Sequence, residues 1–134
     1  MTKKILFCGG GTGGHVFPSV ALTNFFKKKN YETLLVTDKR GAKYIQNNFL
    51  LYKVIDVIPL SQLGFSNKIF FYFKLIQAFF SSIYFLKIEK PNIVFGLGGY
   101  VSLPICLAAR LLNIKIVLYE PNAVLGRTNK IFVH

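Results

Sequence analysis

The run Cys8-Gly9-Gly10-Gly11-Thr12-Gly13-Gly14-His15 decides the fold, because it directly follows the apolar residues Ile5-Leu6-Phe7. A short apolar strand, a glycine-rich turn and an amphipathic segment from about Val16 describe a loop that cradles a phosphate at a helix N-terminus. Glycine lets the backbone approach an anion closely and adopt positive φ. The unpaired N–H groups and the positive end of the helix dipole then face that anion. The sequence therefore predicts a site for a phosphate or diphosphate.

The glycine spacing alone does not identify the ligand. No Lys-Ser/Thr pair follows, which excludes a P-loop. Gly9-x-Gly11-x-x-Gly14 matches the dinucleotide fingerprint formally, and Asp38 lies where that fingerprint has a ribose-binding carboxylate. His15 argues against this reading, since a nicotinamide or flavin site needs no titratable side chain at the turn. A tight strand-to-helix turn without a ligand is the alternative.

The amino-acid composition limits the kinds of ligand and partner that the chain is expected to bind. The chain has 134 residues and a net charge of +12, from 17 Lys and Arg against 5 Asp and Glu. This charge suits an anionic partner such as acidic lipid or a phosphorylated substrate. It does not favour nucleic acid, because the lysines are scattered and a parallel sheet is covered by helices. Cys8 and Cys106 lie in apolar runs and are expected to be buried thiols. No metal-ligand spacing occurs, and we expect neither metal nor cofactor.

Strand and helix patterns alternate along the chain, which predicts an α/β fold with a Rossmann-like, doubly wound parallel sheet. We expect strands at Lys4–Cys8, Thr33–Thr37, Tyr52–Val57, Ile93–Phe95 and Lys115–Tyr119. We expect helices at about Val16–Lys28, Ala42–Asn48, Asn67–Glu89 and Val101–Leu112. A second glycine turn, Gly96-Leu97-Gly98-Gly99, follows the fourth strand, so both turns should fall at the carboxyl edge of the sheet, where ligands bind.

Three segments, taken in order and spacing, resemble the amino-terminal domain of the MurG family of bacterial peptidoglycan N-acetylglucosaminyltransferases. They are Gly10–Pro18, Gly96–Pro104 and Glu120–Lys130. The resemblance covers essentially the whole chain and implies the amino-terminal half of an inverting, metal-independent GT-B glycosyltransferase. One departure is that the family commonly has His-Glu-Gln-Asn where this chain has Tyr119-Glu120-Pro121-Asn122.

An enzyme of this family moves N-acetylglucosamine from UDP-N-acetylglucosamine to lipid I, the undecaprenyl-diphosphoryl-muramoyl-pentapeptide, and makes lipid II. The resemblance implies that residues 1–134 form the acceptor-binding domain, peripheral on the cytoplasmic face of the bacterial inner membrane. The sequence ends in what reads as the start of a helix, Ile131-Phe132-Val133-His134. We therefore expect a carboxy-terminal donor domain to be missing from this chain. The alternative is a non-catalytic, membrane-anchoring subunit of a split glycosyltransferase of the Alg type.

The resemblance also implies roles for single residues. The donor-binding residues would be Thr12, Gly13, Gly14 and Asn122, and the acceptor's diphosphate would lie on Gly98, Gly99, Tyr100 and Ser102. His15 is a candidate general base, but it would equally serve to bind a diphosphate or to cap the loop. Glu120 would orient an acceptor hydroxyl or His15, or simply cap the next helix. An Asx turn is the alternative for Asn122. Thr128 and Asn129 are expected to line the cleft.

The apolar segment Ile69–Leu86 is long enough to reach across a bilayer, but a narrow polar stripe runs along it. The strand before it and the strand after it make it a crossover helix of the sheet. We expect one side to pack on the sheet and the other to dip into an anionic membrane surface. The expected docking residues are Phe70, Phe73, Phe79, Phe80 and Lys74. A helix buried wholly by protein and a transmembrane span are the alternatives.

Overall fold

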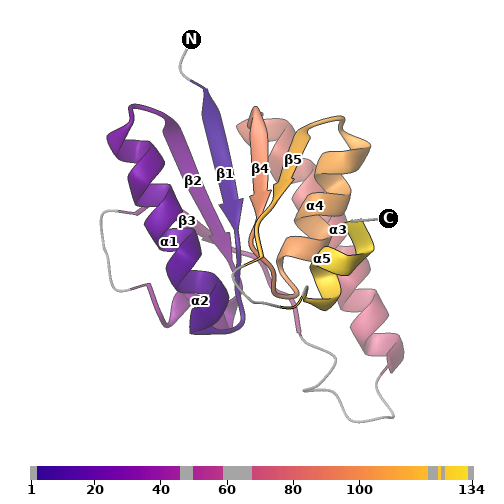
Figure 1. The fold of residues 1–134 in the computed structure, drawn as a ribbon. Helices are drawn as coiled ribbons and strands as arrows, with labels where there is room; N and C mark the ends of the chain where they lie inside the picture. The colour runs from indigo at the N-terminus through magenta and orange to yellow at the C-terminus, as the bar shows by residue number, and fades with distance from the viewer. Residues whose placement is uncertain (1–2, 46–49, 59–67, 121–123, 125, 133–134) are drawn as a thin grey trace.

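Five parallel strands form the centre of the molecule (Figure 1), in the order β3-β2-β1-β4-β5. The computed structural model describes residues 3–45, 50–58, 68–120, 124 and 126–132. The strands are β1 Lys4–Cys8, β2 Glu32–Thr37, β3 Tyr52–Val54, β4 Ile93–Gly96 and β5 Lys115–Leu118. The predicted parallel sheet is thus confirmed. The strand order reverses between β1 and β4, and a ligand site in such a sheet lies beyond the carboxyl ends at that point.

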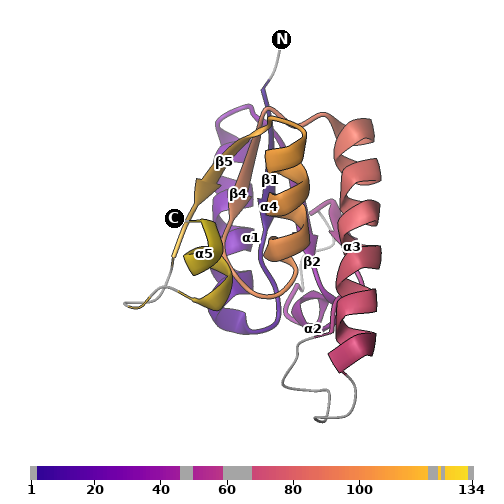
Figure 2. The ribbon, with the colours of Figure 1, turned by 90° about the vertical axis from the view of Figure 1, so that its right-hand side faces the viewer.

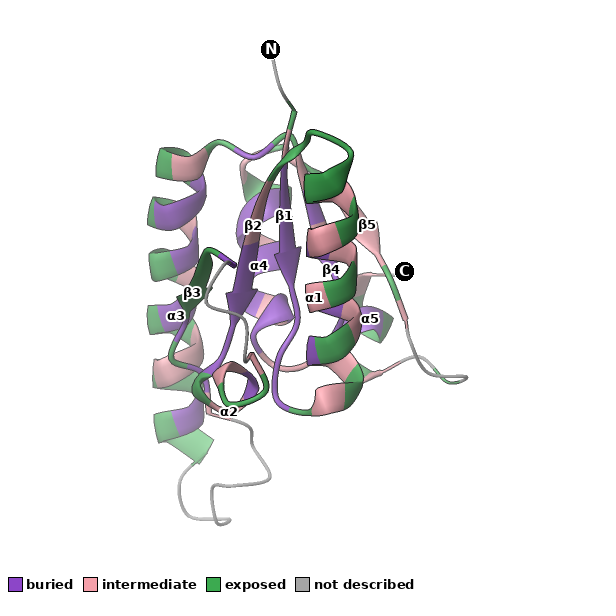
Figure 3. Cartoon of the chain, turned by 90° about the vertical axis from the view of Figure 1, so that its left-hand side faces the viewer, coloured by how far each residue is buried: buried purple, intermediate pink, exposed green. Residues whose placement is uncertain are grey.

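Helices cover both faces of this sheet (Figure 2). They are α1 Gly13–Lys28, α2 Lys39–Ala42, α3 Lys68–Glu89, α4 Ser102–Leu111 and α5 Arg127–Phe132. Successive strand residues point to opposite faces. In β1, Leu6 and Cys8 therefore pack with α3 and α4, whereas Ile5 and Phe7 pack with α1. The buried residues concentrate in the central strands, and the helices carry their exposed residues on the outside (Figure 3).

Three elements have a boundary that differs from the sequence prediction by three residues or more. Helix α1 begins at Gly13 instead of Val16, because the extended Thr12 already stands as its N-cap residue. Helix α2 begins at Lys39 instead of Ala42, because the Asp38 carboxylate accepts the Gly41 N–H at 2.7 Å and caps it there. The predicted end of that helix, Asn48, lies outside the described residues, but α2 already ends at Ala42, so the predicted extent was wrong. Strand β3 ends at Val54, and the apolar residues after it are buried without belonging to the strand.

The strand register brings the carboxyl ends of three strands side by side. Cys8 at the end of β1 pairs with Val36 in β2 and with Gly96 in β4, and Gly96 pairs with Leu118 in β5. The segments that follow β1, β4 and β5 therefore leave the sheet at one edge, the lower edge in Figure 1. All three carry motif residues.

The two cysteines are free and buried, as predicted. The Cys8 thiol donates to the Phe95 carbonyl oxygen at 3.3 Å. The neighbouring Cys106 and complete burial raise the pKa of Cys8 well above its usual range. Both thiols therefore act as small core side chains beneath the carboxyl edge.

Candidate functional site at the carboxyl edge of the sheet

The two glycine turns touch each other. We call residues 9–14 the first loop and residues 96–100 the second loop. Gly99 has φ +79°, and a Cβ placed on it would overlap the carbonyl oxygen of Gly10. The Leu97 N–H also donates to the Cys8 carbonyl oxygen at 2.8 Å. The prediction that both loops lie at one edge is confirmed, and the contact is close enough to exclude any side chain at Gly99.

The first loop presents unpaired backbone donors to the solvent. Thr12 stands before α1 without a side-chain capping bond, and the first turn of α1 contains no acidic residue. Within the described residues, no acceptor reaches the N–H groups of Gly13 and Gly14. Thr12 and Gly14 are exposed. An uncapped helix N-terminus of this kind is suited to hold an anion.

The remainder of the first loop is held from below by Asp38. One oxygen of this buried carboxylate accepts the Gly11 N–H at 2.9 Å as well as that of Gly41. Arg40 faces its other oxygen, with Nε and Oδ2 3.7 Å apart. Asp38 therefore shapes the loop from the protein interior, where a ribose would not reach it.

His15 bridges the two loops. Its Nδ1 lies 2.8 Å from the Leu97 carbonyl oxygen, which can only accept a hydrogen bond. Nδ1 therefore carries the proton in the neutral ring, and Nε2 has the free lone pair. The ring also packs against the Cα of Gly98, where a Cβ would come within 2.8 Å of the imidazole. His15 is thus oriented as a proton acceptor at the junction of the loops.

The second loop forms one wall of a cavity of about 290 Å³. Gly98 and Gly99 both have positive φ, and they line the cavity together with Tyr100 and His15. Ser102, predicted as a fourth binding residue, is fully buried, and its hydroxyl donates to the Gly99 carbonyl oxygen at 2.8 Å. Its hydroxyl thus fixes the conformation of the second loop from behind.

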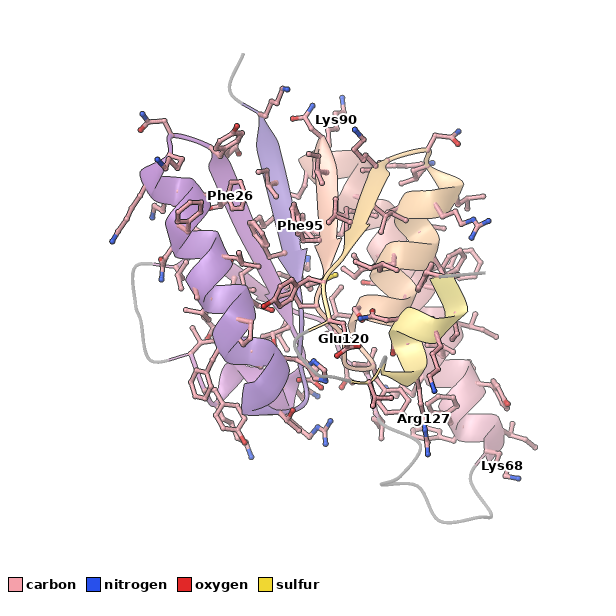
Figure 4. All side chains as sticks on the ribbon, in the orientation of Figure 1. Phe26, Lys68, Lys90, Phe95, Glu120 and Arg127 are labelled. Atoms are coloured by element: carbon pink, nitrogen blue, oxygen red, sulfur yellow. The ribbon has the colours of Figure 1, made fainter. Side chains whose placement is uncertain are left out.

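Gly126 and the first three residues of helix α5 also line this cavity. Figure 4 labels Glu120 and Arg127 at this edge of the molecule. Glu120 Oε2 accepts the Gly126 N–H at 2.7 Å and the Asn129 amide at 3.1 Å. Of the roles that the sequence left open for Glu120, these bonds come nearest to capping the next helix, since they hold the residue before α5 and one side chain in it. Thr128 donates to the Gly99 carbonyl oxygen at 3.2 Å and ties α5 to the second loop. Asn122 lies outside the described residues.

One charged residue of the cavity wall has no role in the sequence prediction. Arg127 is the first residue of α5 and lines the cavity opposite the second loop. Its position between Gly126 and the motif residue Thr128 is the only sequence signal that points to it. Among the described residues, no three His, Cys, Asp or Glu side chains gather as they would around a metal ion.

The predicted docking residues on α3 fall on two different sides of the helix. Phe70, Phe73 and Phe80 are exposed, the last two at 63% each. Phe79 is half-buried and packs against the core. Lys74 turns to Asp56, with Nζ 3.4 Å from the carboxylate. Helix α3 is, in the described parts of the chain, the single helix long and apolar enough to cross a membrane.

Asp56 is held between two cations. Burial alone would raise the pKa of Asp56, but hydrogen bonds and charge attraction from Lys39 and Lys74 outweigh it and lower the pKa below its ordinary value. Lys74 therefore secures α3 to the segment after β3, so its ammonium group is already paired.

The comparisons with known proteins agree with this geometry. Residues 5–134 match the model of the glycosyltransferase family 28 N-terminal domain. The chain belongs to this family. It is 41% identical over 133 residues to a Pelagibacter ubique protein named UDP-N-acetylglucosamine–N-acetylmuramyl-(pentapeptide) pyrophosphoryl-undecaprenol N-acetylglucosamine transferase, covering 99% of this chain and 37% of that protein. A Wolbachia relative from Brugia malayi with the same name is 41% identical over 129 residues, covering 96% of this chain and 35% of that protein.

The solved structures include the same fold. MurG of Acinetobacter baumannii superposes with a TM-score of 0.83 at 33% identity, over 96% of this chain and 38% of that protein. The resemblance to MurG proteins predicted from three sequence segments is thereby confirmed. The chain spans a little over a third of the length of these relatives.

Proposed function

We propose that this chain is the acceptor-binding part of an inverting N-acetylglucosaminyltransferase that converts lipid I to lipid II with UDP-N-acetylglucosamine as donor. The observation that carries the proposal is the meeting of two glycine loops, with unpaired amides and His15 between them, at one edge of the sheet. The names of the relatives give the donor and the lipid-linked acceptor.

The geometry is consistent with the first loop binding the donor and the second loop binding the acceptor. The amides of Gly13 and Gly14 at the N-terminus of α1 would stabilise the charge that develops on the donor's diphosphate as the bond to the sugar breaks. The second loop would hold the diphosphate of the acceptor in the neighbouring cavity. Asn122 would complete the donor contacts, and a carboxy-terminal domain would supply the rest of the donor pocket.

His15 would act as the general base. The bond from Nδ1–H to the Leu97 carbonyl oxygen leaves Nε2 free to accept the proton of the acceptor hydroxyl as that oxygen attacks the sugar. Glu120 would position the start of α5 around the acceptor through its bonds to Gly126 and Asn129. A purely membrane-anchoring subunit would not need either side chain.

The exposed side of α3 would dock on the cytoplasmic face of the inner membrane. Ile69 and Phe73 are exposed, and Lys68 lies at the same end of the molecule as Arg127 (Figure 4). The first turns of α3 reach the second loop, since the Phe71 and Tyr100 rings meet edge to face at 6.1 Å. A lipid-linked diphosphate leaving the membrane there would arrive directly at the second loop.

The test is transfer of labelled N-acetylglucosamine to lipid I by the full-length protein that carries this chain. We expect lipid II to form, and Gly14→Val to reduce kcat by at least about tenfold because its side chain would stand in front of the loop amides. A Cβ at Gly14 meets nothing closer than 3.7 Å, so the fold should persist. Ala21→Val, at an exposed position of the same helix, is the matched control. Full activity of Gly14→Val would refute the role of the first loop.

A further inference from the structure

The cavity beside the second loop holds a cation that has no partner. Arg127 makes no hydrogen bond or ion pair with another described residue through its side chain. Among the described residues that line the cavity, Arg127 and His15 are the only ones with a basic side chain, and none has an acidic one. The opposite wall is backbone, with Gly98 and Gly99 at positive φ. Arg127 is exposed and lines the same cavity as these glycines. An arginine beside a glycine-rich backbone wall is suited to bind phosphate oxygens.

The backbone around Arg127 is fixed on both sides. Before it, the Gly126 N–H is held by Glu120 at 2.7 Å. After it, Thr128 bonds to the Gly99 carbonyl oxygen, and Asn129 bonds to the Tyr119 carbonyl oxygen at 3.3 Å. These contacts determine where the Arg127 side chain starts, so its position at the cavity does not depend on the mobility of a free loop.

A second observation indicates that the cavity is completed by a ligand. Asn129 lines it and is 1% exposed, yet its Oδ1 has no hydrogen-bond partner in the described part of the chain. The amide cannot be turned over, because Nδ2 already donates to two acceptors, the Tyr119 carbonyl and the Glu120 carboxylate. A buried acceptor without a donor is costly. The missing partner must therefore carry an O–H or N–H group.

We propose that Arg127 is a binding residue for the diphosphate of the lipid-linked acceptor. Its guanidinium bridges two phosphate oxygens from the α5 side, while the amides of the second loop bind from the other. The hydroxyl- or amide-bearing sugar next to the diphosphate supplies the donor that Asn129 Oδ1 lacks. This assignment rests on the proposed function, and it places the Arg127 contact on the diphosphate of the acceptor and not on that of UDP-N-acetylglucosamine.

The first test is kinetic and uses the full-length protein. Arg127→Gln should raise the KM for lipid I about tenfold, the usual effect of losing a charge-assisted bond, and leave the KM for UDP-N-acetylglucosamine unchanged. Arg127→Lys should recover only part of this loss, because an ammonium group does not bridge two oxygens. Lys130→Gln removes the same charge at another exposed position of α5, one that does not line the cavity, and should have no effect. Equal effects of Arg127→Gln and Lys130→Gln, no effect of Arg127→Gln, full recovery with lysine, or a change confined to the donor would overturn the proposal.

The second test does not depend on catalysis. Inorganic pyrophosphate, titrated into the same proteins and followed by ³¹P NMR, should bind at least about fivefold more weakly to Arg127→Gln than to Lys130→Gln or the unsubstituted protein. If that difference appears while lipid II does not form, the diphosphate site stands and the proposed function fails. Equal affinities, or no saturable binding by the unsubstituted protein, would overturn the assignment of Arg127.

Discussion

Gly99 is the residue on which the contact between the two loops depends. Its φ of +79° is costly for any other L-residue, and a Cβ would collide with the backbone of Gly10. Backbone atoms of a neighbouring loop do not move away as a flexible side chain would. Gly14 differs in both respects, since it lies in the first turn of α1 and a Cβ there has open space.

We therefore expect substitutions at these two glycines to change stability in opposite directions. Gly99→Ala should lower the free energy of unfolding by more than about 2 kcal/mol, from the strained φ and the collision together. Gly14→Ala should leave it unchanged or raise it by up to about 1 kcal/mol, because alanine is the better helix former. Urea titration followed by circular dichroism measures both. A neutral Gly99→Ala would show that the loops do not pack as described.

At this scale the sequence predicted residue types well and side-chain directions less well. The glycine motifs identified the loops, because a backbone with positive φ strongly favours glycine and can therefore be recognised in the sequence. Ser102, Phe79 and Lys74 were expected to face ligands or lipid, yet they turn to Gly99, the core and Asp56. Those directions follow from how α3 and α4 are rotated on the sheet. Arg127 was assigned no role from the sequence, because its role depends on where α5 packs. A local sequence pattern does not show the packing position of a helix.

The two sides of helix α3 differ in their surroundings, because one side packs on the core and the other is exposed. Phe71, Ala78, Ser82, Phe85 and Leu86 are its buried residues. The opposite side exposes large apolar side chains, and a groove lined by α3 and α4 residues continues this surface to Leu111. A surface helix with this much exposed apolar area is typical of a membrane-associated or partner-binding face.

Substitutions on α3 should separate membrane binding from folding. Phe73→Ser with Phe80→Ser should weaken binding to anionic vesicles, most clearly at high salt, where screening removes the contribution of the lysines. Phe79→Ser should instead lower the melting temperature, because this ring packs on the core. Phe25→Ser, an exposed aromatic residue on α1, is the control for the loss of a surface ring. Unchanged vesicle binding of the double variant would assign the exposed face of α3 to a protein partner.

Element boundaries could be predicted only where a local rule sets them. The start of α2 was missed because its cap, Asp38, was interpreted as a ligand-binding carboxylate, and β3 was predicted too long because burial and strand pairing give the same apolar pattern. Strands β1 and β2 and the long crossover helix followed from periodicity and length alone. Their prediction needed no knowledge of tertiary contacts.

For the whole molecule, the topology explains why the motifs converge. The strand order reverses between β1 and β4, so the first and second loops come together at one edge of the sheet. His15 and Leu97 are 82 positions apart in the sequence, yet a hydrogen bond joins them. The segment after β5 comes to the same edge through its register with β4. Three motifs distant in the sequence thus form one rim, and the parallel sheet is the reason.

The most direct test of this rim is the response of its glycine amides to the two ligands. In the full-length protein labelled with ¹⁵N-glycine, UDP-N-acetylglucosamine should shift the amide resonances of Gly13 and Gly14. A soluble lipid I analogue should shift those of Gly98 and Gly99. Ligand-saturated spectra in which neither pair of amides moves, while the protein still forms lipid II, would contradict the assignment of both loops.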